Sequence, residues 1–226
     1  MKNVLLSGAI ALALAAGAGY WLSQSASSTA PAGSDLFGAA NAQEADDVDT
    51  STITEMAMGP EDASVTVIEY ASFTCPHCAT FHDNQLKQLK ADYVDTGKVR
   101  FIYRDVYFDR FGLWASMVAR CGGEQRFFGI AELIYEQQKD WIGNGQDPVA
   151  ITDRLRKIGK VAGLSEDQLE SCLSDADKAK TLVAWFQENA EEHNVTSTPT
   201  LVINGETHSN MSYAEIQTII DGLLEE

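Results

Sequence analysis

The order of three segments limits the fold more than any other feature of the chain. Residues 65–70 (VTVIEY) are rich in branched and aromatic side chains and predict a buried strand. Apolar residues then recur at helical spacing over residues 76–94, and Pro76 suits the first turn of a helix. Residues 98–104 predict a second strand. Strand, helix and strand in this order form the right-handed crossover of a parallel sheet.

A long helical stretch and a hairpin follow this unit. Residues 111–191 carry helical patterns throughout, including a predicted capping box at residues 165–168. Residues 200–208 predict an antiparallel hairpin, because Asn-Gly at residues 204–205 tolerates the positive φ angles of a tight turn. A second capping box at residues 212–215 opens a C-terminal helix. The complete order predicts an α/β domain with a thioredoxin-like fold and an inserted helical subdomain, an architecture that hosts many functions.

Residues 1–22 predict export. Residues 4–22 are rich in Leu, Ala and Gly and carry no charge. This length lies between a signal-peptide core and the roughly 20 residues that span a bilayer, so a cleaved signal peptide and a retained membrane anchor both stay open. A buried N-terminal helix is a weaker alternative, since no amphipathic pattern is visible. Residues 23–62 are acidic and predict a disordered linker, which leaves residues 63–226 as the folded domain.

The charge distribution excludes one class of function. The formal net charge is -17, and no Lys or Arg occurs between Asn3 and Leu86. Such an acidic surface repels the phosphate backbone of nucleic acids, so no nucleic-acid partner is expected. Export instead implies an oxidising compartment, in which the four cysteines would tend to pair.

The motif Cys75-Pro76-His77-Cys78 places two cysteines at the start of the predicted helix. The sulfur of Cys75 would lie beside free backbone N–H groups and the positive end of the helix dipole, which favour the thiolate. Cysteines in such positions have pKa values lowered to roughly 3.5–7.5 from about 8.5, and a charged His77 would lower the pKa of Cys75 further. A dithiol stabilised in this way gives up its disulfide readily, so the motif predicts an oxidant of other thiols.

Cys78 begins the apolar stripe of the predicted helix and is expected to be the buried, resolving thiol. Glu69 is an acid within an otherwise apolar strand. Two interpretations of Glu69 remain open: a buried acid that accepts the Cys78 proton, or an acid at a solvated strand end. His82 shares a helix face with Cys78, and it could assist that transfer or serve only as a structural histidine.

A zinc site is a competing interpretation of the motif, because two cysteines and a histidine could supply three ligands. Such a site needs a second ligand pair at a matching spacing, and the sequence has none, so neither a metal nor another cofactor is expected. A permanent structural disulfide is also less suited to cysteines in an exposed first turn.

Residues 67–78 (VIEYASFTCPHC) resemble the DsbA family of periplasmic disulfide oxidoreductases, and the likeness extends from about residue 63 to the C-terminus. Thr198-Pro199 precedes the predicted hairpin, and the low frequency of cis X-Pro bonds, about 5–6%, favours trans there. The resemblance implies the opposite: a cis Pro199 facing the motif, with the Thr198 backbone pairing with an extended substrate chain. It also implies substrate contacts at Pro76 and His77 and an apolar groove nearby.

The sequence departs from the best-known DsbA proteins at Thr198, where they carry an apolar residue and some isomerase-like relatives carry Thr. The choice between oxidase and isomerase therefore stays open. Cys121 and Cys172, both in the helical stretch, resemble the second disulfide of one branch of the family, with two buried free thiols as the alternative. No separate dimerisation domain precedes residue 63, which favours a monomer.

Motif and resemblance together predict an enzyme. It would be a periplasmic thiol-disulfide oxidoreductase that introduces disulfide bonds into exported proteins, soluble after signal cleavage or tethered by residues 4–22. Its partners would be unfolded or reduced exported chains and a quinone-linked membrane protein that reoxidises it. The alternatives are a disulfide isomerase or reductase of the same fold, and a non-catalytic binder or chaperone of exported chains.

Overall fold

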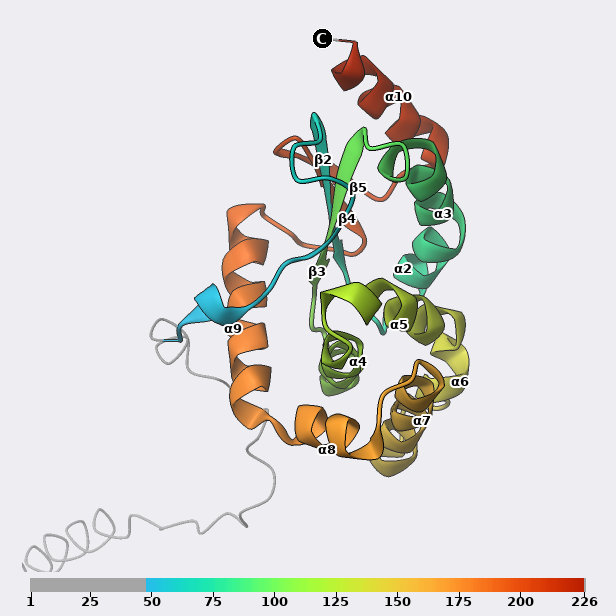
Figure 1. Cartoon of the computed structure of the whole chain (residues 1–226), viewed down its shortest axis with the longest axis vertical. Helices are drawn as coiled ribbons and strands as arrows, with labels where there is room; N and C mark the ends of the chain where they lie inside the picture. Colours follow the sequence, from blue (N-terminus) through green and yellow to red (C-terminus); the bar gives the residue numbers. More distant parts are fainter. Residues whose placement is uncertain (1–47, 226) are drawn as a thin grey trace, which may run out of the picture. The chain divides into compact units, whose positions relative to one another are not determined.

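A five-stranded sheet forms the centre of the computed structural model, which describes residues 48–225 (Figure 1). The strand order is β1-β3-β2-β4-β5. The β2 and β3 strands are parallel, and the other neighbours are antiparallel. The strands are β1 (Met56–Met58), β2 (Val65–Ala71), β3 (Val99–Asp105), β4 (Thr200–Ile203) and β5 (Glu206–Ser209).

One continuous helix connects β2 with β3 and confirms the predicted crossover. Two of its four segments, η2 and η3, are π-helical, which the sequence pattern did not predict. The first π-helical segment begins at His82, one turn beyond the motif. Its segments are α2 (Pro76–Phe81), η2 (His82–Leu86), α3 (Lys87–Leu89) and η3 (Lys90–Val94).

Six helices separate β3 from the C-terminal hairpin and form the helical insertion, defined here as α4 to α9. Their span agrees with the predicted helical stretch to within about one residue at each end. The C-terminal helix α10 (Tyr213–Leu224) follows the hairpin. The insertion comprises α4 (Arg110–Cys121), α5 (Glu124–Glu136), α6 (Gln138–Ile142), α7 (Pro148–Val161), α8 (Glu166–Ser174) and α9 (Ala176–Glu192).

Local signals fixed several of these boundaries. Both predicted capping boxes are present, at Ser165 with α8 and at Ser212 with α10. The hairpin turn uses Asn204 and Gly205 at φ angles of 45° and 87°, as an Asn-Gly turn requires. The predicted α/β fold with an inserted helical subdomain is therefore confirmed.

Helices cover both faces of the sheet (Figure 1). Tyr70 and Val202 form a buried cluster with Phe186 of α9 on one face. On the other face, Val67 and Ala71 belong to a core that includes Leu89 and residues of α10. Because side chains alternate along a strand, Glu69 lies on the same face as Val67 and Ala71, beneath the helix that carries the motif.

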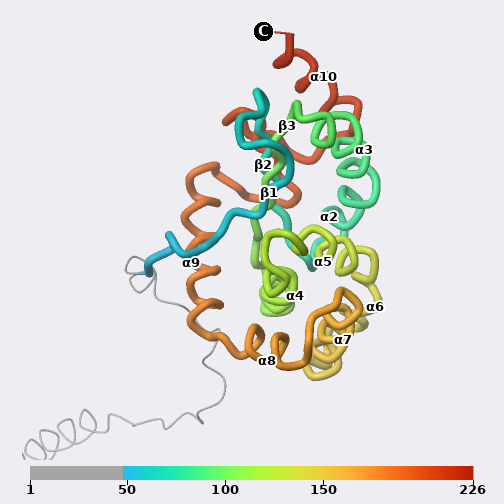
Figure 2. The backbone as a smooth tube through the Cα atoms, viewed as in Figure 1, coloured from blue at the N-terminus to red at the C-terminus, as the bar shows by residue number. Residues whose placement is uncertain are grey.

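The N-terminal part of the folded domain begins earlier than the sequence indicated. The expected linker extended to residue 62, and this boundary is wrong, because β1 pairs with β3 and η1 (Thr50–Thr52) precedes it. Figure 2 shows this segment passing from α9 to the sheet. The predicted export segment and linker residues 23–47 lie outside the described residues. None of the helices in residues 48–225 combines the length and apolar character needed to cross a bilayer.

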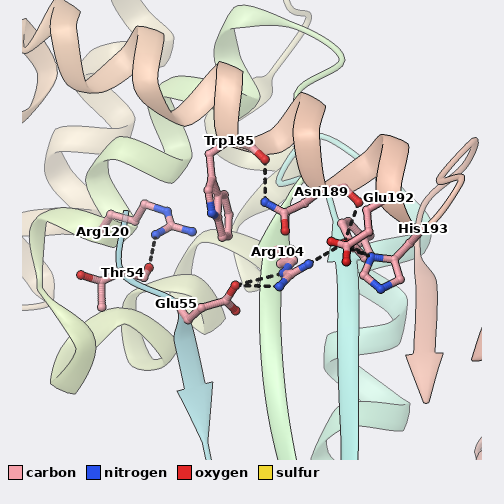
Figure 3. Close-up of polar contacts among 9 residues, drawn as sticks. Thr54, Glu55, Arg104, Arg120, Trp185, Asn189, Glu192 and His193 are labelled. Atoms are coloured by element: carbon pink, nitrogen blue, oxygen red, sulfur yellow. Dashed lines mark hydrogen bonds and ion pairs between the residues drawn. The ribbon is translucent and has the colours of Figure 1, made fainter. Parts of the chain in front are cut away.

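Polar contacts explain why this acidic, weakly patterned segment is ordered (Figure 3). Glu55 accepts a hydrogen bond of 2.9 Å from Arg104 of β3, and the carbonyl of Thr54 accepts one of 3.0 Å from Arg120 of α4. Both guanidinium groups also lie over the Trp185 ring of α9, at 5.7 and 5.3 Å from its centroid. Three elements that follow the segment at a distance in the sequence, β3, α4 and α9, therefore hold it in place.

Candidate functional site

The two motif cysteines lie where β2 leads into α2. Cys75 is the N-cap residue of α2, with Pro76 in the first turn. Its side chain is 9% exposed, whereas Cys78 is fully buried. Pro76 and His77 are exposed. Both cysteines are free thiols, so the geometry is that of the reduced protein.

The surroundings of Cys75 stabilise its thiolate. A hydrogen bond from the Cys78 thiol has the largest effect and lowers the pKa of Cys75 from 9.0 to about 5, although burial acts in the opposite direction. The backbone N–H groups of Cys78 and His77 contribute in the same sense. The helix N-terminus thus favours the thiolate as predicted, but the largest contribution comes from the Cys78 thiol, and the predicted effect of a charged His77 side chain stays a prediction.

Cys78 has the opposite character. Burial raises the pKa of its thiol well above the usual range, and the neighbouring Cys75 and Glu69 raise it further. One sulfur of the pair is thus readily ionised and reachable, and the other holds its proton.

Glu69 is fully buried on β2, so the alternative of a solvated strand end is wrong. Its Oε2 lies 2.8 Å from Nε2 of His82. The His82 ring stacks on Tyr135 of α5, with 4.1 Å between the centroids. The structure therefore joins Cys78, Glu69 and His82 in one buried cluster beneath the motif.

The loop before β4 lies against Cys75 from the other side. The Thr198-Pro199 peptide bond is cis, as the resemblance implied, and Pro199 is buried. The Sγ atom of Cys75 lies 3.5 Å from the carbonyl oxygen of Thr198. The two segments singled out in the sequence, some 120 residues apart, thus meet at one sulfur.

The helical insertion also contacts the motif turn, and no pattern in the sequence predicts this contact. The side-chain amide of Gln138 in α6 donates hydrogen bonds to the carbonyls of Phe73 and Cys75, at 2.8 and 2.9 Å. The hydroxyl of Thr74 donates to Asp109, the N-cap residue of α4, at 2.7 Å. Neither contact can be seen in the local sequence, because Gln138 and Asp109 lie far along the chain from the motif-turn residues that they contact.

An open pocket of about 680 Å³ lies between the motif helix and the α5 and α6 helices of the insertion. Its lining combines apolar surface with polar and charged side chains, and His82 is one of the lining residues. The charged lining residues include Asp83, Lys87, Glu132, Glu136 and Lys139.

The remaining two cysteines form a pair of their own. Cys121, at the end of α4, and Cys172 of α8 are joined by a disulfide across 51 residues. The alternative of two buried free thiols does not describe this structure. Within residues 48–225, no cluster of three His, Cys, Asp or Glu side chains has an arrangement that could hold a metal ion.

Comparisons with known proteins place this site in a class. The family model described as thioredoxin matches residues 51–222. This chain therefore belongs to the thioredoxin family. Among solved structures it is similar to alpha-DsbA1 of Wolbachia pipientis, with 25% identity, a TM-score of 0.70 and coverage of 75% of this chain and 90% of that one. The resemblance to DsbA proteins is thereby confirmed.

Other relatives carry related names. A putative protein-disulfide oxidoreductase of Rickettsia bellii is 32% identical over 173 residues, which cover 76% of this chain and 65% of that protein. The chain thus spans a little under two thirds of the length of this relative. A protein-disulfide isomerase from Novosphingobium aromaticivorans is 26% identical, with a TM-score of 0.69 and coverage of 76% of this chain and 98% of the other.

Proposed function

We propose that this protein is a thiol-disulfide oxidoreductase that introduces disulfide bonds into exported proteins. The observation that carries the proposal is the contrast between the two motif sulfurs: Cys75 has a pKa of about 5, and Cys78 is buried with a raised pKa. A stabilised thiolate makes the reduced form favourable, so the disulfide form is a strong acceptor of electrons.

The reaction begins with the Cys75–Cys78 disulfide. A substrate thiolate attacks Sγ of Cys75, a mixed disulfide forms, and the bond between Cys75 and Cys78 breaks. Cys78 leaves with the electron pair and takes up a proton. A second substrate thiolate then attacks the substrate sulfur of the mixed disulfide, and Cys75 leaves as a thiolate, which its surroundings stabilise. The substrate leaves with a new disulfide, and the enzyme is left as the dithiol.

Glu69 is the proposed source of the proton for Cys78. A newly formed thiolate in a buried site is unfavourable, and the raised pKa of Cys78 means that protonation follows its release. Glu69 is fully buried close to this sulfur, which supports its role as the acid. In the reoxidation direction, Glu69 would take the proton back.

The substrate would be an unfolded or reduced exported chain. Exposed Pro76 and His77 flank the reactive sulfur, and the Thr198 carbonyl lies 3.5 Å from it, where an extended chain could pair with backbone groups. Reoxidation would require a quinone-linked membrane partner. The export segment supports a periplasmic location, free or tethered by residues 4–22.

An isomerase or reductase of the same fold is the second candidate. Two observations favour it: Thr198 stands at the position where some isomerase-like relatives carry Thr, and a structural neighbour is called a protein-disulfide isomerase. The redox state of the motif in cells separates the two, because an oxidase is held oxidised and an isomerase reduced.

The redox equilibrium of the motif with glutathione tests the proposal directly. We expect an oxidising equilibrium, far from the roughly −270 mV of thioredoxin. A value as reducing as that of thioredoxin would overturn the oxidase assignment. Cys75→Ser serves as the second arm: if the variant still supports disulfide formation in reduced substrates, the protein acts as a binder or chaperone instead.

A further inference from the structure

We propose that His82 is a positioning residue that passes protons between buried Glu69 and the solvent of the pocket beside α5 and α6. This inference rests on the proposed function, because it concerns the proton that Cys78 gains when the motif disulfide is opened. Glu69 is fully buried, so its carboxyl has no contact with water of its own. If Glu69 gave its proton to Cys78 without help, it would be left as a buried, ionised carboxylate, which is unfavourable, so a neighbouring group must supply a proton to Glu69 at the same time.

The contacts of Glu69 leave one candidate for that neighbour. Its Oε2 is 2.8 Å from Nε2 of His82, within direct hydrogen-bond distance. Its Oε1 has no hydrogen-bond partner among residues 48–225 and is buried. One carboxyl oxygen is therefore engaged with the imidazole, and the other is unpartnered in the interior. A catalytic role is one of the explanations for a buried polar atom that has no hydrogen-bond partner.

His82 in turn reaches the solvent. Its side chain is only 7% exposed, and it lines the 680 Å³ pocket. Its second ring nitrogen, Nδ1, makes no hydrogen bond within residues 48–225 and is not among the buried unpartnered atoms. An imidazole with one nitrogen on a buried acid and the other toward water can exchange a proton at each end.

The surroundings hold the ring in this orientation. Tyr135 stacks on it, with 4.1 Å between the ring centroids. The rings of Phe81 and Tyr103 lie edge-on to it, with centroid separations of 6.0 and 5.8 Å. The titratable groups near the ring are of two kinds. The buried ones are Glu69 of β2, Cys78 of α2, Tyr103 of β3 and Tyr135 of α5. Those that line the pocket include Asp83 and Lys87 of the motif helix, Glu136 of α5 and Lys139 of α6.

Bonds, protons and electrons all balance in the half-cycle that oxidises the substrate. The substrate thiolate forms a bond with Cys75, and Cys78 leaves as a thiolate. As Glu69 gives its carboxyl proton to Cys78, Nε2 of neutral His82 passes its proton to Glu69, and Nδ1 takes up a proton from the solvent of the pocket. The proton taken up balances the one that the substrate thiol released to solvent when it became a thiolate. On reoxidation the same transfers run backwards and return the imidazole to its starting tautomer. No electrons pass through Glu69 or His82, so the pair changes the rate of exchange rather than its stoichiometry.

Two variants separate this role from a structural one. His82→Gln keeps the size of the side chain and a hydrogen-bond donor for Glu69 but cannot carry a proton at pH 7. His82→Ala opens space next to the pocket, which free imidazole can enter. His208→Gln is the matched control, since His208 lies on the edge strand β5 at the far side of β4 from β2.

The experiment measures the single-turnover rate at which the disulfide form of each full-length protein oxidises a two-cysteine peptide at pH 7. General acid–base groups contribute about 10²–10⁴-fold, so we expect His82→Gln to be at least about tenfold slower than wild type. Free imidazole should speed up His82→Ala severalfold and leave His82→Gln unchanged. His208→Gln should react at the wild-type rate.

A wild-type rate in His82→Gln overturns the inference, and so does a folded, slow His82→Ala that imidazole does not restore. If His82→Ala fails to fold, the inference is tested by His82→Gln alone, through its rate relative to wild type. Failure of the proposed function looks different, because the wild-type protein itself would not oxidise the peptide.

Discussion

The side-chain amide of Gln138 donates a hydrogen bond of 2.9 Å to the carbonyl oxygen of Cys75, so a residue of the helical insertion holds the turn that carries the reactive sulfur. The same nitrogen donates to the carbonyl of Phe73 at 2.8 Å. The Gln138 side chain is buried, so its two hydrogen bonds to these carbonyls lie in the interior of the domain. The insertion is therefore part of the support of the motif as well as a cover for the sheet.

Replacing this amide tests that link. Gln138→Met keeps the length of the side chain and removes both donors, at a cost of about 0.5–1.5 kcal/mol for each hydrogen bond. We expect a loss of about 1–3 kcal/mol in the free energy of unfolding, measured with urea, and a changed alkylation rate of Cys75. Gln137→Met is the control, because the Gln137 side chain makes no hydrogen bond in the described part of the chain. Equal stability of the two variants would contradict the link.

The disulfide between Cys121 and Cys172 should stabilise the insertion. It closes a loop across 51 residues, which corresponds to roughly 4 kcal/mol when the loss of chain entropy in the unfolded state is considered alone. We expect the double variant Cys121→Ala/Cys172→Ala to lose a few kcal/mol of unfolding free energy by urea titration, with an unchanged pKa at Cys75. A double variant as stable as the wild-type protein would show that the bridge does not stabilise the fold.

Arg120 and Asp105 form a buried ion pair at 2.8 Å, with the two side chains 6% and 1% exposed. Arg120→Met leaves the Asp105 charge unpaired in the interior, which typically costs about 3–5 kcal/mol. The double variant Arg120→Met/Asp105→Asn should recover part of this loss, because the uncompensated charge is gone. Urea unfolding of both variants measures the difference.

An exposed ion pair provides the comparison for this prediction. Lys90 and Asp95 lie 2.6 Å apart, with both side chains about half exposed. Lys90→Met should cost at most about 1 kcal/mol, since surface ion pairs contribute little. If Arg120→Met were as mild as Lys90→Met, the buried pair would not be stabilising the contact between α4 and β3.

The catalytic unit was predictable because its signals are local. The β-branched run of β2, the helical spacing after Pro76 and the Asn-Gly turn each specify one element within a few residues. The motif also predicts its own chemistry, because a helix N-terminus stabilises a cysteine thiolate wherever that helix lies in the fold. These parts of the fold and site therefore followed from the sequence.

The parts that could not be predicted depend on distant partners. Met56–Met58 is a strand only because β3 is beside it, and its own surroundings are acidic and rich in Ser and Thr. Gln138 binds carbonyls more than 60 residues away, which no helical or strand pattern encodes. Burial of Glu69 likewise required the helix above it, so the sequence left two interpretations open.

The pKa of Cys75 makes the stability of the reduced protein depend on pH. The folded protein holds this thiol at a pKa of about 5, below the 9.0 of a thiol in the unfolded chain. A lowered pKa contributes stability that is fully present above the unfolded value and is lost as the pH falls through the folded value. Between pH 7 and pH 4 the reduced protein should therefore lose roughly 2–3 kcal/mol from this group, at about 1.4 kcal/mol per pH unit above pH 5.

The oxidised protein is the control for this prediction, because neither Cys75 nor Cys78 titrates in it and its other ionisable groups are the same. Urea unfolding of both forms at pH 7 and pH 4 isolates the contribution of one sulfur. The raised pKa of Cys78 does not interfere, since it affects stability only as the pH rises through the unfolded value. We expect the difference in unfolding free energy between the reduced and oxidised forms to shrink toward acid. A difference independent of pH would mean that Cys75 is an ordinary thiol in the folded protein, and the disulfide form would then have no reason to be a strong oxidant.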